Sequence, residues 1–189
     1  MFCFLSNKIS TNLAELNLNN MNYKLSILFI LITSLTYAQF GVEVGYSLTE
    51  VKITPGDSTS DTNGFTIGAV HDHELSESLD LQSGLGLQFL DKIGEDSNTL
   101  LALSAEVQYY LAGRDSGFFA HAGPQYTLRF KDIDGLKKGA VNAGLGLGYD
   151  FSEQISFKVT YLTQLSDYSD IDDFEIKRSG INLGLQYFF

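Results

Sequence analysis

Few residues of this chain have the types and spacing that chemistry requires. His71 and His73 flank Asp72, so a strand through this segment would place both imidazoles on one face, as a transition-metal pair needs. Zinc sites use three or four ligands, and the sequence supplies no identifiable third one. We therefore expect no metal site, and no motif predicts a catalytic or cofactor-binding residue.

A glycine-rich run, formed by Gly144, Gly146 and Gly148, could be mistaken for a phosphate-binding loop. Such a loop needs a helix directly after the glycines, because the N-terminus of that helix faces the phosphate. These glycines instead alternate with apolar residues, so they indicate packing space within a strand. The hydrolase pattern G-x-S-x-G does not occur either. We therefore expect no enzyme and no cofactor.

The segment 166–175 is strongly acidic. Its carboxylates belong to Asp167, Asp170, Asp172, Asp173 and Glu175. Calcium prefers clustered oxygen ligands, but an EF-hand loop needs a glycine at its sixth position, which this segment lacks. We expect a solvated loop, and weak binding of a divalent cation stays an open alternative.

The elements that would position these residues are strands. Apolar residues alternate with small or polar ones along eight segments of about ten residues each, the length that a strand needs to cross a bilayer. These segments are 39–48, 63–73, 79–89, 101–111, 117–130, 141–149, 155–165 and 180–189. Because successive side chains of a strand point to opposite faces, each strand has one apolar face.

The connectors between these segments alternate in length. Four are polar and variable in length, and three are short. The first group is 49–62, 91–98, 131–137 and 166–175, and the second is 74–78, 112–116 and 150–154. Outer-membrane barrels have short periplasmic turns at one end and longer extracellular loops at the other. The pattern therefore predicts an all-β fold, an eight-stranded antiparallel up-and-down transmembrane β-barrel with both termini in the periplasm.

A soluble barrel such as a lipocalin would instead turn the apolar face inward and the opposite face to water. That opposite face is dominated here by glycine and uncharged Gln, Asn, Ser and Thr, whereas a soluble exterior carries many charges. The membrane arrangement is therefore favoured. Aromatic residues at strand ends suit interfacial girdles; they are Phe40, Phe89, Tyr109, Tyr149, Phe151, Tyr187 and Phe189.

Residues 21–38 have the features of a secretory signal peptide. Lys24 supplies a positive charge, the run from Leu25 to Leu35 is mostly apolar, and Ala38 precedes a plausible cleavage site. The apolar run is shorter than the roughly 20 residues of a spanning helix. We expect the mature chain to begin with the barrel, residues 39–189.

Residues 1–20 precede the expected signal and show no clear periodicity. We expect them to be a disordered product of an over-long gene start, with translation beginning at Met21. The single cysteine, Cys3, excludes a disulfide framework. A lipoprotein needs a cysteine directly after the cut, where this chain has Gln39, so we expect no lipid anchor.

Three stretches carry a likeness to a known family: the signal end Tyr37-Ala38-Gln39, the opening Phe40-Gly41-Val42-Glu43-Val44-Gly45-Tyr46, and the closing strand Gly180–Phe189. Through them, residues 39–189 resemble the small outer-membrane β-barrel-domain proteins of Gram-negative bacteria. That group contains PorT-like proteins, with OmpX-like and OmpA-like barrels as more distant likenesses. The closing aromatic residue resembles the signal that the barrel-assembly machinery recognises in its clients. The resemblance transfers no catalytic motif.

Four charged or titratable side chains fall on the inward face of the predicted barrel, namely Glu43, Glu106, His121 and Lys158. All four lie in the half of the lumen near the short turns. Because lone charges are costly in a filled interior, we expect one structural ionic cluster. An eight-stranded barrel has an interior that side chains just fill, so a general porin is excluded.

The net charge of −11 argues against nucleic acid as a partner. We expect an outer-membrane protein with a structural role or a binding role of its extracellular loops. Its expected partners are outer-membrane lipid and lipopolysaccharide, the barrel-assembly machinery, and an extracellular or periplasmic protein. The alternatives are a membrane-barrel enzyme that acts on lipid A, although His121 would lie at the periplasmic end, and an accessory barrel of a secretion or assembly system.

Overall fold

The computed structural model describes residues 38–55, 58–93, 96–114, 117–132, 135–170 and 175–189. The expected signal peptide and residues 1–20 lie outside these described residues, apart from Ala38. The strands are β1 (Ala38–Thr54), β2 (Ser58–Asp61), β3 (Gly64–Ser76), β4 (Leu79–Ile93), β5 (Asp96–Tyr110), β6 (Phe118–Arg129), β7 (Gly139–Ser152), β8 (Ile155–Gln164) and β9 (Glu175–Phe188). None of the described residues forms a helix long and apolar enough to cross a membrane.

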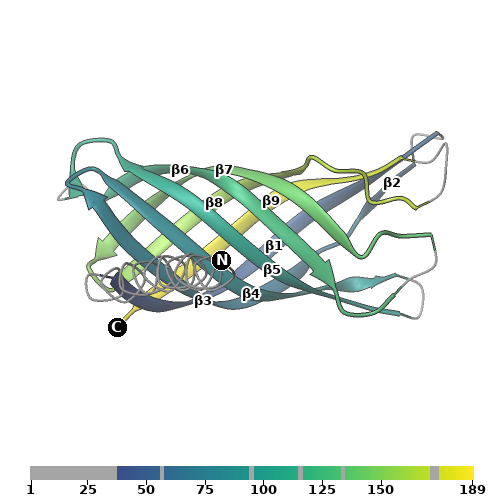
Figure 1. Ribbon diagram of the computed structural model, residues 1–189, viewed down its shortest axis with the longest axis horizontal. Coiled ribbons are helices and arrows are strands. Elements are labelled where there is room, and N and C mark those ends of the chain that lie inside the picture. The colour runs from purple at the N-terminus through teal and green to yellow at the C-terminus, as the bar shows by residue number, and fades with distance from the viewer. Residues whose placement is uncertain (1–37, 56–57, 94–95, 115–116, 133–134, 171–174) are drawn as a thin grey trace, which may run out of the picture. The chain divides into compact units, whose positions relative to one another are not determined.

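Eight of these strands, β1 and β3 to β9, form a closed antiparallel barrel (Figure 1). Each strand pairs with the next one along the chain, and β1 pairs with β9 to close the ring. The closing register runs from Gly41 opposite Phe188 to Thr54 opposite Glu175. The predicted eight-stranded antiparallel barrel is thus confirmed. Closure pairs the backbone groups that an open sheet would leave free at its edges.

Two of the segments expected to be loops are partly strand. β1 continues through residue 54, and β2 pairs with its last part, from Glu50 opposite Asp61 to Ile53 opposite Ser58. β4 and β5 likewise continue toward each other until Ile93 pairs with Asp96. Each residue other than proline has a backbone donor and a backbone acceptor, whatever the polarity of its side chain. The pairing of a hairpin can therefore extend beyond the apolar part of its strands.

The alternation of faces is as predicted. Leu145 on β7 points outward and its side chain is 64% exposed, whereas its neighbour Gly144 is buried. The outer surface carries many further large apolar residues, among them Val44, Leu85, Leu103, Leu147 and Leu185. Rings also pair on this surface near the short turns, where Phe118 contacts Tyr149 at 4.5 Å between centroids. Such a surface is suited to lipid rather than to water.

The inward glycines of β7 make room for large side chains that come from the adjacent strand and not from the opposite wall of the lumen. A Cβ on Gly148 would collide with the ring of Phe119, and one on Gly146 would collide with the imidazole of His121. Both large residues belong to β6, the strand next to β7, and pair directly with these glycines. The glycines therefore let two β6 side chains lie over the neighbouring strand.

The C-terminal end of β9 lies at the short-turn end of the barrel. The backbone N–H of Phe188 donates to the carbonyl oxygen of Gln154, in the turn between β7 and β8, at 2.8 Å. Gly41 near the start of β1 pairs with the same Phe188. The first residues of β1 and the last residues of β9 are thus at one end, together with the turns that join β3 to β4, β5 to β6 and β7 to β8.

Candidate functional site

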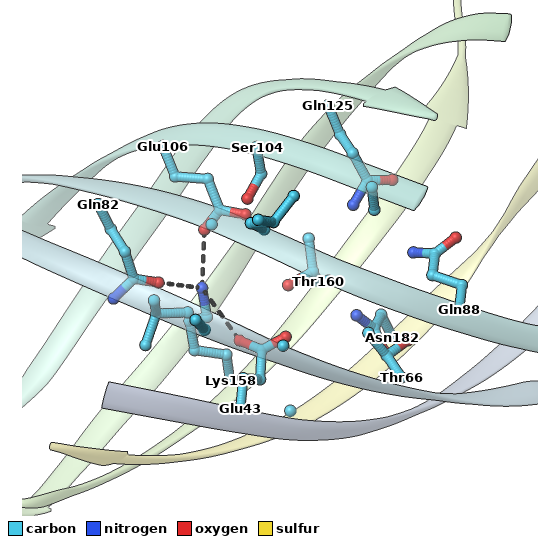
Figure 2. Close-up of a pocket in the computed structure, with 18 of the residues that line it drawn as sticks. Glu43, Thr66, Gln82, Gln88, Ser104, Glu106, Gln125, Lys158, Thr160 and Asn182 are labelled. Carbon is cyan, nitrogen blue, oxygen red and sulfur yellow. Dashed lines mark hydrogen bonds and ion pairs between the residues drawn. The ribbon is translucent and has the colours of Figure 1, made fainter. Parts of the chain in front are cut away.

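The four inward residues singled out from the sequence come from four different strands. Glu43 lies on β1, Glu106 on β5, His121 on β6 and Lys158 on β8. The structure brings all four together in the lumen, and Figure 2 shows Lys158 reaching toward both glutamates. Because β1, β5 and β8 occupy separate parts of the ring, the group spans the lumen rather than lining one wall.

Lys158 is the centre of this group. Its Nζ donates to Oε2 of Glu106 and to Oε1 of Gln82, both at 2.8 Å, and lies 3.9 Å from Oε2 of Glu43. The lysine side chain is only 6% exposed. A buried ammonium is tolerated where opposite charges and hydrogen bonds replace its hydration, and these three neighbours supply both.

His121 extends the group along β6. Its Nδ1 lies 3.2 Å from Oε2 of Glu106, and its Nε2 lies 3.4 Å from Oγ1 of Thr160. The imidazole is fully buried and lies over Gly146. Glu106 is therefore shared between Lys158 and His121, so a change at Glu106 affects both.

Two glutamines complete the group and were not singled out from the sequence. Gln186 donates from Nε2 to Oε2 of Glu43 at 2.5 Å and to Oε1 of Gln82 at 2.9 Å. The strand register contains the signal that would have found them, since Gln82 pairs with Glu106 and Gln186 pairs with Glu43. We call the six residues the luminal cluster; they are Glu43, Gln82, Glu106, His121, Lys158 and Gln186.

A second charged group lies nearer the short turns, and sequence analysis missed it. Arg114, from the turn between β5 and β6, forms an ion pair with the fully buried Asp80 and lies 3.6 Å from Glu74. Its guanidinium is 5.2 Å from the ring centre of Tyr110. Gly113, directly before it in this turn, has a φ of 79°, a conformation that favours glycine.

Two larger cavities lie at the ends of the lumen. The one at the short-turn end has a volume of about 520 Å³ and is lined by Arg114, Tyr110 and, from the luminal cluster, Gln82 and Gln186. The one at the loop end has a volume of about 350 Å³ and shares no lining residue with the first. Between them, a void of about 40 Å³ adjoins Lys158, and another of about 20 Å³ lies beside Asn142 and Asn182. The luminal cluster thus separates the two cavities.

The remaining sequence candidates do not converge on a site. His71 contacts the ring of Phe40 on the outer surface, while Asp72 between the histidines lines the lumen. Across the described parts of the chain, no three His, Cys, Asp or Glu side chains are grouped as a metal ion requires. In the acidic segment, Asp167 accepts hydrogen bonds from backbone N–H groups, and Asp172 and Asp173 lie outside the described residues.

The chain is similar to several solved structures, and the first of them shares this fold. Neisserial surface protein A is 13% identical, with a TM-score of 0.53, and the match covers 80% of this chain and 99% of that one. Ail, the attachment invasion locus protein of Yersinia pestis, is 14% identical, with a TM-score of 0.49 and coverage of 79% and 99%. A de novo designed transmembrane β-barrel is 16% identical, with a TM-score of 0.46 and coverage of 80% and 95%.

A comparison with curated proteins finds no match. The family described as "Outer membrane protein beta-barrel domain" does match, over residues 25–189, which include the whole barrel. The match agrees with the closed ring of eight strands, the apolar outer surface and the polar lumen. The chain therefore belongs to the outer membrane protein beta-barrel domain family, and its place is the outer membrane.

Proposed function

We propose that this protein is a closed outer-membrane barrel whose lumen does not conduct solutes and whose loop end acts as a binding surface. The observation that carries the proposal is the luminal cluster. Lys158 of β8 is hydrogen-bonded to side chains of β4 and β5, and Gln186 of β9 to side chains of β1 and β4. These contacts link opposite walls, so the protein closes its own lumen.

The cluster also argues against catalysis on lipid A. An enzyme that modifies lipid A needs a reactive side chain that the lipid can reach from the outer leaflet. His121 is fully buried in the lumen, and its two nitrogens lie against Glu106 and Thr160. Its arrangement supports a structural role for the imidazole.

Conductance across a planar lipid bilayer tests the closed lumen. We expect the refolded wild-type barrel to give no stable conductance steps. A variant that truncates the centre of the cluster, Lys158→Ala combined with Glu106→Ala, should give small steps or flickering openings if it remains folded. A matched control removes an exposed pair on the outer face of β9, Glu175→Ala with Lys177→Ala, and should stay silent. Steady conductance of the wild type would overturn the proposal.

We further propose that the short turns, the start of β1 and the end of β9 face the periplasm. The longer connectors and β2 would then face the exterior. The support is the asymmetry of the barrel, since outer-membrane barrels keep their short turns on the periplasmic side. A membrane-impermeant thiol reagent on intact cells tests this orientation. Ser60→Cys in β2 should be labelled in intact cells, and Glu153→Cys in the β7–β8 turn only after the outer membrane is permeabilised. The reverse pattern would contradict the orientation.

The partners follow from these surfaces as proposals. The apolar outer face would contact outer-membrane lipid and lipopolysaccharide, and the last strand would engage the barrel-assembly machinery. A protein partner outside the cell would meet the loop end. Exchange of the loop-end connectors should abolish capture of that partner while the barrel still folds, whereas capture that survives the exchange would assign the contact to another surface.

A further inference from the structure

The cavity at the loop end differs in character from the rest of the lumen. It has a volume of about 350 Å³, within the size range of small-molecule sites. Part of its wall is apolar, formed by Val51 and Ile53 of β1, Ile176 of β9 and Leu136. The other part carries two arginines, Arg129 and Arg178, at the loop ends of β6 and β9.

Among the described residues, Arg129 is held in place by an amide and an aromatic ring, without a carboxylate. Its guanidinium donates from one terminal nitrogen to Oδ1 of Asn98 at 2.7 Å and lies 5.0 Å from the ring centre of Tyr168. The residue is only 3% exposed, and its Nε is buried without a hydrogen-bond partner. A guanidinium has five N–H donors, so this site leaves donor capacity unused.

The second arginine adds to the positive charge of the cavity. Among the ion pairs formed by the described residues, none includes Arg129 or Arg178. Asp61 also lines the cavity, but it is exposed and pairs with neither. Two guanidinium groups that share a half-buried cavity, with no paired acid among the described residues, repel each other and are incompletely hydrated, which is a cost. A bound anion would remove that cost.

A third donor is available in the same cavity. Tyr168 is 6% exposed, and its hydroxyl is buried without a hydrogen-bond partner. It lines the cavity together with both arginines. Two planar guanidinium forks and a hydroxyl suit the oxygens of a phosphate, sulfate or carboxylate group.

We propose that this cavity binds a soluble organic anion, with its acidic group on Arg129, Arg178 and Tyr168 and its apolar part against Val51, Ile53 and Ile176. The lining residues of the strands point into the lumen, so the ligand enters from the mouth and not from the surrounding lipid. The inference deepens the proposed function, on which it rests, because it names the chemistry of one ligand of the loop end.

Phenyl phosphate is a suitable probe, because it joins a phosphate to an apolar ring. Titration into the barrel in phosphatidylcholine nanodiscs, followed by the arginine Nε–Hε resonances, should show saturable binding. Inorganic phosphate at equal ionic strength should bind at least about tenfold more weakly, because it leaves the apolar wall empty. Benzyl alcohol, which lacks the charge, should not compete.

Arg129→Gln and Arg178→Gln should each weaken phenyl phosphate binding at least about tenfold, the loss expected for a hydrogen bond to a charged group. Lys177→Gln is the matched control, since it removes one positive charge next to Arg178 in sequence but on the exposed outer face. It should leave the affinity unchanged. If Arg129→Gln does not fold, the affinity of Tyr168→Phe for phenyl phosphate tests the site instead. This variant removes only the hydroxyl and keeps the ring beside the guanidinium, and its affinity should be weaker.

The inference is overturned if phenyl phosphate does not saturate, if inorganic phosphate binds equally well, or if Lys177→Gln loses as much affinity as Arg178→Gln. An unchanged affinity in Tyr168→Phe also overturns it.

Nanodiscs with an anionic phospholipid distinguish a soluble phosphate from a lipid headgroup. Competition by that lipid for phenyl phosphate binding would contradict a soluble ligand. Conductance of the same protein in a planar lipid bilayer keeps the proposals apart: a silent barrel without binding refutes only the anion site, and an open barrel refutes the closed lumen.

Discussion

The Nζ of Lys158 lies 2.8 Å from Oε2 of Glu106, although β8 and β5, which carry them, are separated in the sheet by β6 and β7. Most hydrogen bonds of a barrel join neighbouring strands along the wall. This one crosses the lumen, and the bond from Lys158 to Gln82 of β4 crosses it as well. The pair therefore connects parts of the ring that backbone pairing does not connect directly.

A double-mutant cycle on this pair should reveal strong coupling. Lys158→Ala and Glu106→Ala should each destabilise the barrel by about 3–5 kcal/mol where the remaining charge stays dry, and by less where water enters the lumen. The double variant should lose less than the sum of the two single losses, because the second change removes a charge that is already unpaired. Urea unfolding in liposomes measures all four free energies.

The control cycle uses Glu175 and Lys177, which form an exposed pair at 2.6 Å on the outer face of β9. Exposed ion pairs contribute about 0.2–1 kcal/mol at most, so this cycle should show little coupling. Strictly additive losses for Lys158 and Glu106 would show that the two residues do not share a network in the folded protein.

The sequence predicted the eight strands of the barrel and their faces because a strand has a period of two residues. The positions of Leu145 and Gly146 illustrate this, since adjacent residues lie on opposite sides of the wall. Where a connector continues as a paired hairpin, as at β2, the alternation becomes too weak to predict the strand. Side-chain period alone does not report where backbone pairing stops.

The candidate site was predicted only in part, for a related reason. The alternation identified Glu43 and Lys158 as inward. It did not give positions along the barrel axis precisely enough to add Gln82 and Gln186, because those positions depend on the register between strands. Arg114 lies in a turn, where no alternation exists, and its contact with the buried Asp80 appears only in the folded structure. The cavity at the loop end combines strand ends and loop residues, so no single segment of sequence indicates it.

Arginine substitutions on adjacent residues of β7 test the two faces. Leu145→Arg places a charge on the lipid face, where it should cost about 2–4 kcal/mol near the bilayer middle. Gly146→Arg should fail for a steric reason, because even a Cβ there collides with His121. Unfolding in bilayers measures the first effect, and Leu145→Ala is the control without charge. If Leu145→Arg is as stable as Leu145→Ala, the outer face of β7 does not contact lipid.

Processing and closure can be tested together on the protein expressed in a Gram-negative host. We expect the mature chain to begin at Gln39 and to fractionate with outer membranes. The unboiled protein should migrate faster than the boiled protein on a denaturing gel, because a closed barrel offers detergent no free sheet edge. Equal migration of the two samples, or recovery in the soluble periplasm, would contradict this expectation. N-terminal sequencing of the membrane fraction gives the cleavage site.

Asp167 should make the loop between β8 and β9 sensitive to acid. Hydrogen bonds from the backbone N–H groups of Ser169 and Ile176, each 3.0 Å from its Oδ1, hold the pKa of this carboxyl below its ordinary value. A lowered pKa means that the charged form stabilises the folded loop. This contribution is complete above the unfolded pKa, about 3.9, and is lost as the pH falls through the folded value.

Hydrogen exchange at the amides of Ser169 and Ile176 measures this loss, as protection factors at about pH 6 and about pH 2. Asp167→Asn keeps the acceptor oxygen without the charge, so protection should be weaker but should no longer change across this range. Asp167→Ala should lose protection at both values. Asp132→Asn is the control, since its exposed carboxylate contacts Lys138 and not these amides. If the acid-dependent loss persists in Asp167→Asn, another group is responsible for it.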